Sequence, residues 1–236
     1  GAKLTTEVRN KLSDSAISGY LSGTTLGSQF APEPTTGQYW VRSGIAGFTS
    51  DAAQHFYLPE RYTDPFGNVT KLEFDSKYDL FIKSSTDPAG NTVTVEAFDF
   101  RVLAPRELKD INDNLFEVAF DALGMPVAMA VKGKGTEGDN LIGFDDTLIN
   151  PDPNTVIRFF TGNYDEAEAR RLLGTATARY LYYFGEQQQT SGSVTYGSHP
   201  PCAGAMLREQ HVAQLGPTEV SPLQTGFEYS DGMATV

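Results

Sequence analysis

The residues that most often carry out catalysis are few and scattered in this chain. Its histidines, His55, His199 and His211, show neither pairing one helical turn apart nor the spacing of metal ligands. The only cysteine, Cys202, lacks the surroundings of a catalytic thiol and leaves no internal disulfide. His211 follows Glu209 by two residues, which is more typical of a contact on a strand surface than of a general base. The sequence therefore predicts no enzyme and no cofactor, with a hydrolase built on Glu209 and His211 as the least favoured alternative.

Five acidic residues near a glycine-rich segment form the other group with chemical potential. They are Glu137, Asp139, Asp145, Asp146 and Asp152. A calcium loop of the EF-hand type needs ligands at alternate positions and a bidentate glutamate at the twelfth, and this segment has neither. We interpret Gly133–Asn140 as a solvated loop and predict no metal site.

The most regular pattern is a turn motif that recurs every 23 residues. It reads Asp-Pro-Phe-Gly-Asn, Asp-Pro-Ala-Gly-Asn and Asp-Ile-Asn-Asp-Asn. Proline presets the backbone for a turn, glycine accepts a positive φ, and aspartate and asparagine side chains bond to nearby main chain. In the third motif Asp113 takes the glycine position, and aspartate tolerates the left-handed region better than most residues. The predicted structural residues of the turns are Asp64, Gly67, Asn68, Asp87, Gly90, Asn91, Asp110 and Asn114.

Each turn is followed by a run in which side chains alternate by twos, as in a strand. The runs close on the pairs Phe74-Asp75, Phe98-Asp99 and Phe120-Asp121. We expect return strands at Tyr78–Ser84 and Phe100–Leu103. Because a repeat of this length cannot bury its apolar face alone, neighbouring units must stack. The predicted fold class is mainly β, with antiparallel hairpins in a curved sheet and two short helices.

Four segments follow from these patterns. Residues 1–50 form an N-terminal segment predicted to be partly flexible, and residues 51–132 form the repeat sheet. Residues 133–175 hold a loop and two short helices between Pro153 and Leu173, with acidic first-turn residues and Gly174 as a stop. Residues 176–236 return to strands, including Met206–Val212 and Leu223–Tyr229, around a flexible loop at 185–204.

Composition excludes some classes of function. The net charge of −12 argues against nucleic acid as a partner, because phosphate binding is built from lysine and arginine. No apolar run approaches the roughly 18–20 residues of a membrane helix, and no signal peptide opens the chain. We expect the chain to be a piece of a longer protein.

The repeat resembles a known family. Asp-x-x-Gly-Asn, followed by an alternating run and an aromatic–aspartate pair, is similar to the YD repeat of Rhs proteins. More narrowly, six blocks in order resemble the B component of bacterial Tc (toxin complex) insecticidal toxins. The blocks are Phe56–Gly67, Tyr78–Leu80, Phe120–Met125, Leu172–Thr177, Arg208–Val212 and Tyr229–Gly232.

This resemblance implies a structural function. It suggests a segment of an Rhs/YD-repeat shell that encapsulates a toxin domain in a secreted, extracellular toxin complex. The implied partners are the remainder of the shell, the C component with its toxin cargo and, through another domain, the pore-forming A component; no nucleic acid or membrane contact is expected of this segment. The alternative is a carbohydrate-binding surface module that uses Trp40 and Tyr180–Tyr183, and burial of Trp40 would exclude it.

Overall fold

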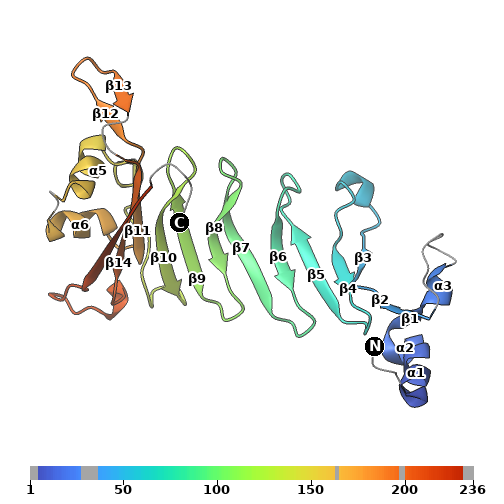
Figure 1. Ribbon diagram of the computed structural model, residues 1–236. Helices are drawn as coiled ribbons and strands as arrows, with labels where there is room; N and C mark the ends of the chain where they lie inside the picture. The colour runs from blue at the N-terminus through green and yellow to red at the C-terminus, as the bar shows by residue number, and fades with distance from the viewer. Residues whose placement is uncertain (1–4, 28–36, 163–164, 197–199, 231–236) are drawn as a thin grey trace. The chain divides into compact units, whose positions relative to one another are not determined.

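The chain is mainly β and its largest element is an open antiparallel sheet (Figure 1). The computed structural model describes residues 5–27, 37–162, 165–196 and 200–230. Within these residues, eleven strands follow the order β15-β14-β11-β10-β9-β8-β7-β6-β5-β4-β3, and the order does not return on itself. The same residues also form six short α-helices. The predicted fold class is confirmed in its antiparallel β character, and the curvature of the sheet stays a prediction.

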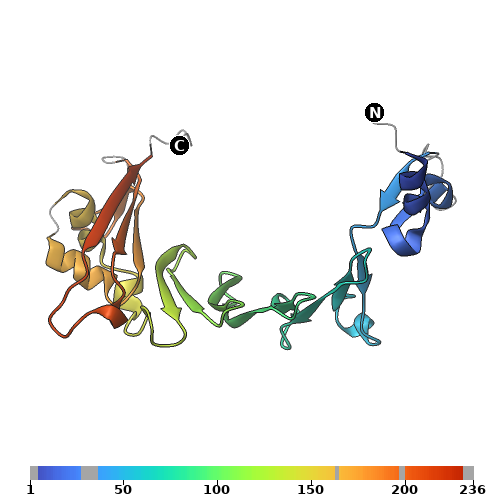
Figure 2. The same cartoon turned by 90° about the horizontal axis from the view of Figure 1, so that it is seen from below.

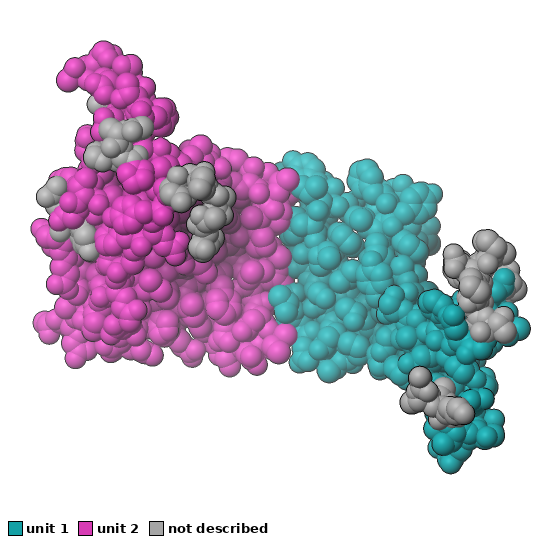
Figure 3. Space-filling model, in the orientation of Figure 1, with its two compact units in different colours: residues 1–93 teal, residues 94–236 magenta. Residues whose placement is uncertain are grey.

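The chain divides into two compact units, residues 1–93 and 94–236 (Figure 3). In the first unit, β1 and β2 pair as a separate two-stranded sheet, and β3 to β6 form successive antiparallel pairs. Its elements are α1 (Thr6–Ser13), α2 (Ser15–Ser18), β1 (Tyr20–Ser22), α3 (Gly23–Gly27), β2 (Tyr39–Val41), β3 (Ile45–Gly47), the 3₁₀ turn η1 (Ala52–Gln54), β4 (Arg61–Thr63), β5 (Val69–Phe74) and β6 (Ile82–Thr86).

The second unit begins within β7 and contains the remaining strands. Its elements are β7 (Thr92–Asp99), β8 (Ala104–Lys109), β9 (Leu115–Phe120), β10 (Pro126–Gly133), α4 (Asp146–Ile149), α5 (Pro153–Phe160), α6 (Glu166–Leu173), β11 (Ala178–Tyr183), β12 (Glu186–Gln188), β13 (Val194–Tyr196), β14 (Cys202–Arg208), the 3₁₀ turn η2 (Val212–Gln214) and β15 (Leu223–Tyr229). In Figure 2, α5 and α6 lie on one face of β11 and β14, which they contact.

The two helices predicted between Pro153 and Leu173 are present as α5 and α6. Their first turns are capped by aspartates, because Asp152 accepts the Asn154 N–H at 2.8 Å and Asp165 accepts the Glu168 N–H at 2.7 Å. The expectation of only two helices was wrong. The short helix α4 precedes them, and α1 to α3 form in the N-terminal segment, where Thr5 caps α1.

Three strand predictions need correction. Phe100–Leu103 is a turn, because the Asp99 carboxylate accepts the N–H groups of Arg101 and Val102, and the return strand is β8. The other return strand, β6, begins at Ile82 because Asp75 folds the preceding residues into a turn. The second strand of the C-terminal pair is β15 as predicted, but its partner β14 ends at Arg208, so His211 lies outside it.

The loop predicted at 185–204 is partly ordered as a hairpin. Strands β12 and β13 pair, and their connecting turn closes through the Gln189 N–H to Ser193 oxygen bond of 2.8 Å. Strand β14 then begins at Cys202. Polar composition alone did not reveal these strands.

Nearly all of the hydrophobic core lies in the second unit. The helices bury their apolar faces on the sheet, where Phe159, Leu172, Leu181 and Met206 form one fully buried cluster. Apart from Ala52, the buried hydrophobic residues of the described chain lie beyond residue 93. The hairpins of the first unit therefore depend on their turns and ladders more than on a core.

We predict that Gly204→Ala destabilises the second unit. A Cβ at this position of β14 would lie 2.6 Å from Cε1 of Phe159 and 3.1 Å from Cε1 of Phe160. Because overpacking of a closed core typically costs about 1–3 kcal/mol, the denaturant midpoint should fall accordingly. Gly226→Ala in β15 is the matched control, since its Cβ would meet nothing within 4 Å. Equal midpoints for both variants would contradict this packing.

Candidate functional site: the aspartate turns

The three predicted turns share one hydrogen-bonding arrangement. In each, Oδ1 of the aspartate accepts the N–H groups of the residues two and four positions later. Oδ2 accepts the side-chain amide of the asparagine four positions later. The three distances are 2.9, 2.9 and 2.8 Å at Asp87, 2.8, 2.8 and 2.8 Å at Asp64, and 2.8, 2.9 and 3.0 Å at Asp110. One carboxylate thus accepts two main-chain N–H groups that the strand ladder leaves unpaired, and one side-chain amide.

Three further aspartates begin turns that sequence reasoning did not identify as turns. Asp121 repeats the first two bonds at 2.9 Å each, with Met125 in place of the asparagine. Asp99 accepts two main-chain N–H groups. Asp75, only 5% exposed, accepts four, at 2.5–3.2 Å. We call the six turns that begin at Asp64, Asp75, Asp87, Asp99, Asp110 and Asp121 the aspartate turns.

The aspartate turns connect every consecutive pair of strands from β4 to β10. Their aspartates are 11 or 12 residues apart, so the 23-residue repeat contains two turns rather than one. The signal for the second set was the aromatic–aspartate pair at the end of each run. The sequence pattern predicts that this pair closes a strand, and the structure shows that the aspartate also begins the next turn.

These contacts favour the charged carboxylates. The pKa of Asp64, Asp87 and Asp110 is lowered, first because each side chain accepts a hydrogen bond from its asparagine and then because main-chain N–H groups point at it. Burial of Asp75 raises its pKa, but its four main-chain donors outweigh burial and the net pKa is lowered. These four aspartates are therefore charged at neutral pH.

The glycine position of the motif adopts a left-handed backbone. The φ angles are +86° at Gly67, +89° at Gly90, +63° at Asp113 and +86° at Gly124. A Cβ at Gly67 or Gly90 would meet nothing within 4 Å. Any cost of a side chain there arises from backbone strain and not from a clash.

The catalytic candidates form no catalytic arrangement among the described residues. Nδ1 of His211 lies 2.7 Å from Oδ2 of the buried Asp139, not against Glu209, which accepts from Gln224. Asp139 also accepts the Thr177 hydroxyl and the Val212 N–H. The described bonds of His211 include no serine, threonine or cysteine side chain. We interpret this cluster as a clamp that holds the segment after β14.

Two other candidates, His55 and Cys202, make contacts that differ from those of a catalytic base or nucleophile. Nδ1 of His55 lies 2.8 Å from Oδ2 of Asp79 on the surface, and this bond raises the pKa of His55. Burial raises the pKa of the Cys202 thiol to about 11, so the thiolate is scarce at neutral pH. His199 lies outside the described residues.

The five acidic residues weighed as calcium ligands have separate roles. Asp145 and Asp152 cap α4 and α5, Asp146 accepts the Asn150 side-chain amide, and Glu137 accepts the Lys134 N–H. Asp139 is 1% exposed, so the prediction of a solvated loop was wrong at this residue. Within the described ranges, no three histidine, cysteine or acidic residues are grouped to hold a metal ion. No helix there is long and apolar enough to cross a membrane.

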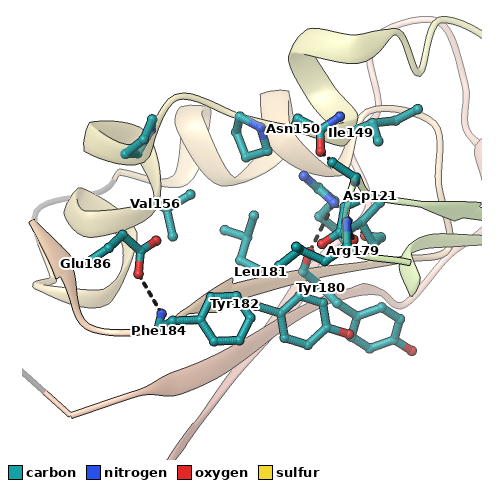
Figure 4. A pocket seen from close by; sticks show the side chains of 15 residues that line it. Asp121, Ile149, Asn150, Val156, Arg179, Tyr180, Leu181, Tyr182, Phe184 and Glu186 are labelled. Carbon is teal, nitrogen blue, oxygen red and sulfur yellow. Dashed lines mark hydrogen bonds between the residues drawn. The ribbon is translucent and has the colours of Figure 1, made fainter. Parts of the chain in front are cut away.

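The buried Arg179 is one of the residues that line a cavity of the second unit (Figure 4). It has a volume of about 170 Å³ and lies between β11, α5 and the turn at Asp121. Arg179 is fully buried, and burial lowers its pKa to about 10. No local sequence pattern marks Arg179, because two of the carbonyls that accept its hydrogen bonds, those of Val127 and Leu148, are distant in the chain.

We predict that valine at the glycine position of a turn is costly. Gly67→Val and Gly90→Val should each lower the free energy of unfolding by about 1–3 kcal/mol, because a branched side chain disfavours positive φ. Asp113→Val should behave alike, whereas Asp113→Gly should be neutral or stabilising. Denaturant midpoints of the variants and the parent test this prediction. Valine variants with the same midpoint as the parent would contradict the importance of the turns.

We also predict a pH effect of the turn asparagines. Asn91→Ala removes the largest cause of the lowered Asp87 pKa, so NMR titration should show this pKa rising. The parent's contribution is present above the unfolded pKa of about 3.9 and is lost as pH falls through the lower folded pKa. Asn91→Ala should therefore have a lower free energy of unfolding than the parent above this pH range, and the difference between the two should be smallest in strong acid. The control is Asn112→Ala in the turn at Asp110, because the Asn112 side chain makes none of the described turn bonds. If Asn112→Ala raised the pKa of Asp110 as much as Asn91→Ala raises that of Asp87, the role assigned to the turn asparagines would be refuted.

Comparison with known proteins gives structural matches only. No protein-family model and no curated protein matches the chain. The crystal structure of TcdB2-TccC3 matches with a TM-score of 0.64 at 18% identity, over 98% of this chain and 10% of that one. TcdB2-TccC3-Cdc42 matches with a TM-score of 0.65 at 16% identity, over 98% and 12%. TcdB2-TccC3 without its hypervariable C-terminal region gives 0.56 at 17%, over 84% and 11%.

The chain thus spans about a tenth of the length of these structures. At such identities the likeness concerns the fold. The chain therefore has the fold of a segment of TcdB2-TccC3, and the predicted resemblance to the B component of Tc toxins is confirmed at the level of the fold.

Proposed function

We propose that the chain is a wall segment of an Rhs/YD-repeat shell that encloses a toxin domain in a Tc-type toxin complex. The observation that carries this proposal is the ladder of hairpins joined by aspartate turns. It is supported by the likeness of the fold to TcdB2-TccC3 over 98% of this chain. A sheet built from repeated hairpins can form a wall, because each hairpin pairs with the next one along the chain.

The partners of such a wall are the remainder of its shell and a C component that carries the toxin. Contact with the pore-forming A component runs through another domain, and the assembly is secreted. The chain itself performs no catalysis in this proposal, which agrees with the contacts of His211 and the high pKa of Cys202.

Two observations favour the alternative function of a carbohydrate-binding surface. Trp40 in β2 is 47% exposed, so the burial that would exclude a sugar platform is not found. In the second unit, Tyr180 and Tyr182 border a cavity of about 380 Å³ whose floor includes Ala203 and Gly226. Aromatic faces beside small residues suit the apolar face of a sugar ring.

The proposed wall function is tested by measuring whether the toxin domain is protected from proteolysis. The full-length protein that contains this segment should be produced with its C component and subjected to limited proteolysis. We predict that the toxin domain resists digestion in the complex, and that combined Gly67→Val and Gly90→Val accelerates its cleavage while Asp113→Gly does not. Equal digestion with and without the wall protein would contradict enclosure.

A glycan array tests the alternative. If the segment is wall alone, the chain should bind no glycan above the level of the variants Trp40→Ala and Tyr180→Ala. Specific binding that either variant abolishes would favour the carbohydrate-binding function. Tyr182 is left intact, because its hydroxyl donates to the Pro126 carbonyl and supports β10.

A further inference from the structure

The cavity of about 380 Å³ lies on the face of β11, β14 and β15 that points away from α5 and α6. Met206 of β14 packs with the helices, and a Cβ at Gly204 would contact Phe159 of α5. Because side chains alternate along a strand, Ala203 and Ala205 point to the opposite face. These two alanines form the floor of the cavity.

The strand register places large side chains beside small ones on this face. Two rows cross the three strands in the order β11, β14, β15, and they are Tyr182, Ala203, Glu228 and Tyr180, Ala205, Gly226. We call the cavity over these six residues the tyrosine trough. Neighbouring strands lie about 4.8 Å apart, so the main chains at Tyr182 and Glu228 are separated by about 10 Å with one alanine between them.

The tyrosines present ring rather than hydroxyl to the trough. The Tyr182 hydroxyl donates to the Pro126 carbonyl at 2.8 Å, and the Tyr180 hydroxyl donates to Sδ of Met129 at 3.5 Å. Both acceptors belong to β10, which pairs with the edge of β11 that lies away from β14. The hydroxyls are therefore directed away from the trough, and the aromatic carbons remain on its side.

The charge of the trough is negative. Glu228 is the one charged residue of the described lining, and it is exposed. The described residues provide no basic side chain that forms an ion pair with it. An aromatic face attracts a cation through its quadrupole, and a carboxylate across the same groove adds to that attraction. The trough is therefore complementary to a cation with an apolar surface.

We propose that the tyrosine trough binds a small organic cation of the quaternary ammonium class. The ammonium group lies over Ala203, between the ring of Tyr182 and the carboxylate of Glu228. A quaternary ammonium has no N–H group and needs no hydrogen-bond acceptor, which suits a lining whose tyrosine hydroxyls are already engaged. A neutral sugar would gain nothing from the charge of Glu228. The inference goes beyond the wall function and does not depend on it.

Choline and its neutral isostere 3,3-dimethylbutan-1-ol test the site on the intact chain. We predict that choline binds with a dissociation constant on the order of 1 mM, as expected for a ligand of its size. The alcohol has the same shape without the charge, so it should bind at least about tenfold more weakly. Ligand-detected NMR titrations and calorimetry measure both.

A pair of charge variants separates a contact in the trough from attraction to the whole chain, whose net charge is −12. Glu228→Gln should weaken choline binding at least about threefold, because it removes the carboxylate beside the ammonium group. Glu166→Gln changes the net charge by the same amount. Glu166 is exposed in α6, on the other face of the sheet, and does not line the trough. This control should bind choline as the parent does.

Variants of the lining test the shape of the trough and the role of the ring. A Cβ at Gly226 would meet nothing within 4 Å, so Gly226→Leu should fold, occupy the trough and weaken choline binding at least about tenfold. Tyr180→Phe keeps the ring and should bind choline as the parent does, whereas Tyr180→Leu should weaken binding. Thermal unfolding of each variant is recorded alongside, so that a loss of binding through unfolding is recognised.

Four results would overturn the proposal. Choline could fail to bind at several times the expected constant, or the neutral alcohol could match choline. Gly226→Leu could leave choline binding intact in a folded protein, or Glu166→Gln could weaken binding as much as Glu228→Gln. Gly226 and Glu228 are exposed residues of β15, so their variants leave the buried core unchanged and decide the question even if Tyr180→Leu does not fold.

Discussion

The structure depends on one interaction, the capture of main-chain N–H groups by an aspartate carboxylate at the start of a turn. A hairpin turn leaves donors that the ladder cannot pair, and each unpaired donor is costly when it is shielded from water. At Asp87 a single side chain satisfies two main-chain donors and holds a third group, the Asn91 amide. Six such turns, from Asp64 to Asp121, join the consecutive strands from β4 to β10.

The aspartate turns explain how the hairpins of the first unit can form with almost no hydrophobic core. Its hairpins expose large hydrophobic side chains, among them Phe56, Phe66 and Tyr62, while the helices α5 and α6 seal a closed core only in the second unit. The wall proposed for this chain has the same requirement, because each of its strands gains its partners from neighbouring strands. The exposed apolar surface of the hairpins is then consistent with further partners in a larger assembly.

The sequence revealed the features whose cause is local. The turns at Asp64, Asp87 and Asp110 follow from residues within five positions of each other, and α5 and α6 follow from their caps and their apolar spacing. The sequence predicts a strand at Phe100–Leu103, because three of its four residues are apolar, whereas Asp99 bends this segment into a turn through its hydrogen bonds with main-chain N–H groups. The contacts of Asp139 with His211 and of Arg179 with Leu148 join residues 72 and 31 positions apart, and no local pattern encodes them.

Amide hydrogen exchange tests the central interaction most directly. The N–H groups of Asn68, Asn91 and Met125 donate to aspartates of their turns at 2.8–2.9 Å. The account predicts that these amides exchange slowly although they lie in turns, and that Asp87→Ala releases the Asn91 amide while the amides of the other turns stay protected. Exchange at the rate of an unstructured peptide in the parent chain, or unchanged protection of Asn91 in Asp87→Ala, would contradict it.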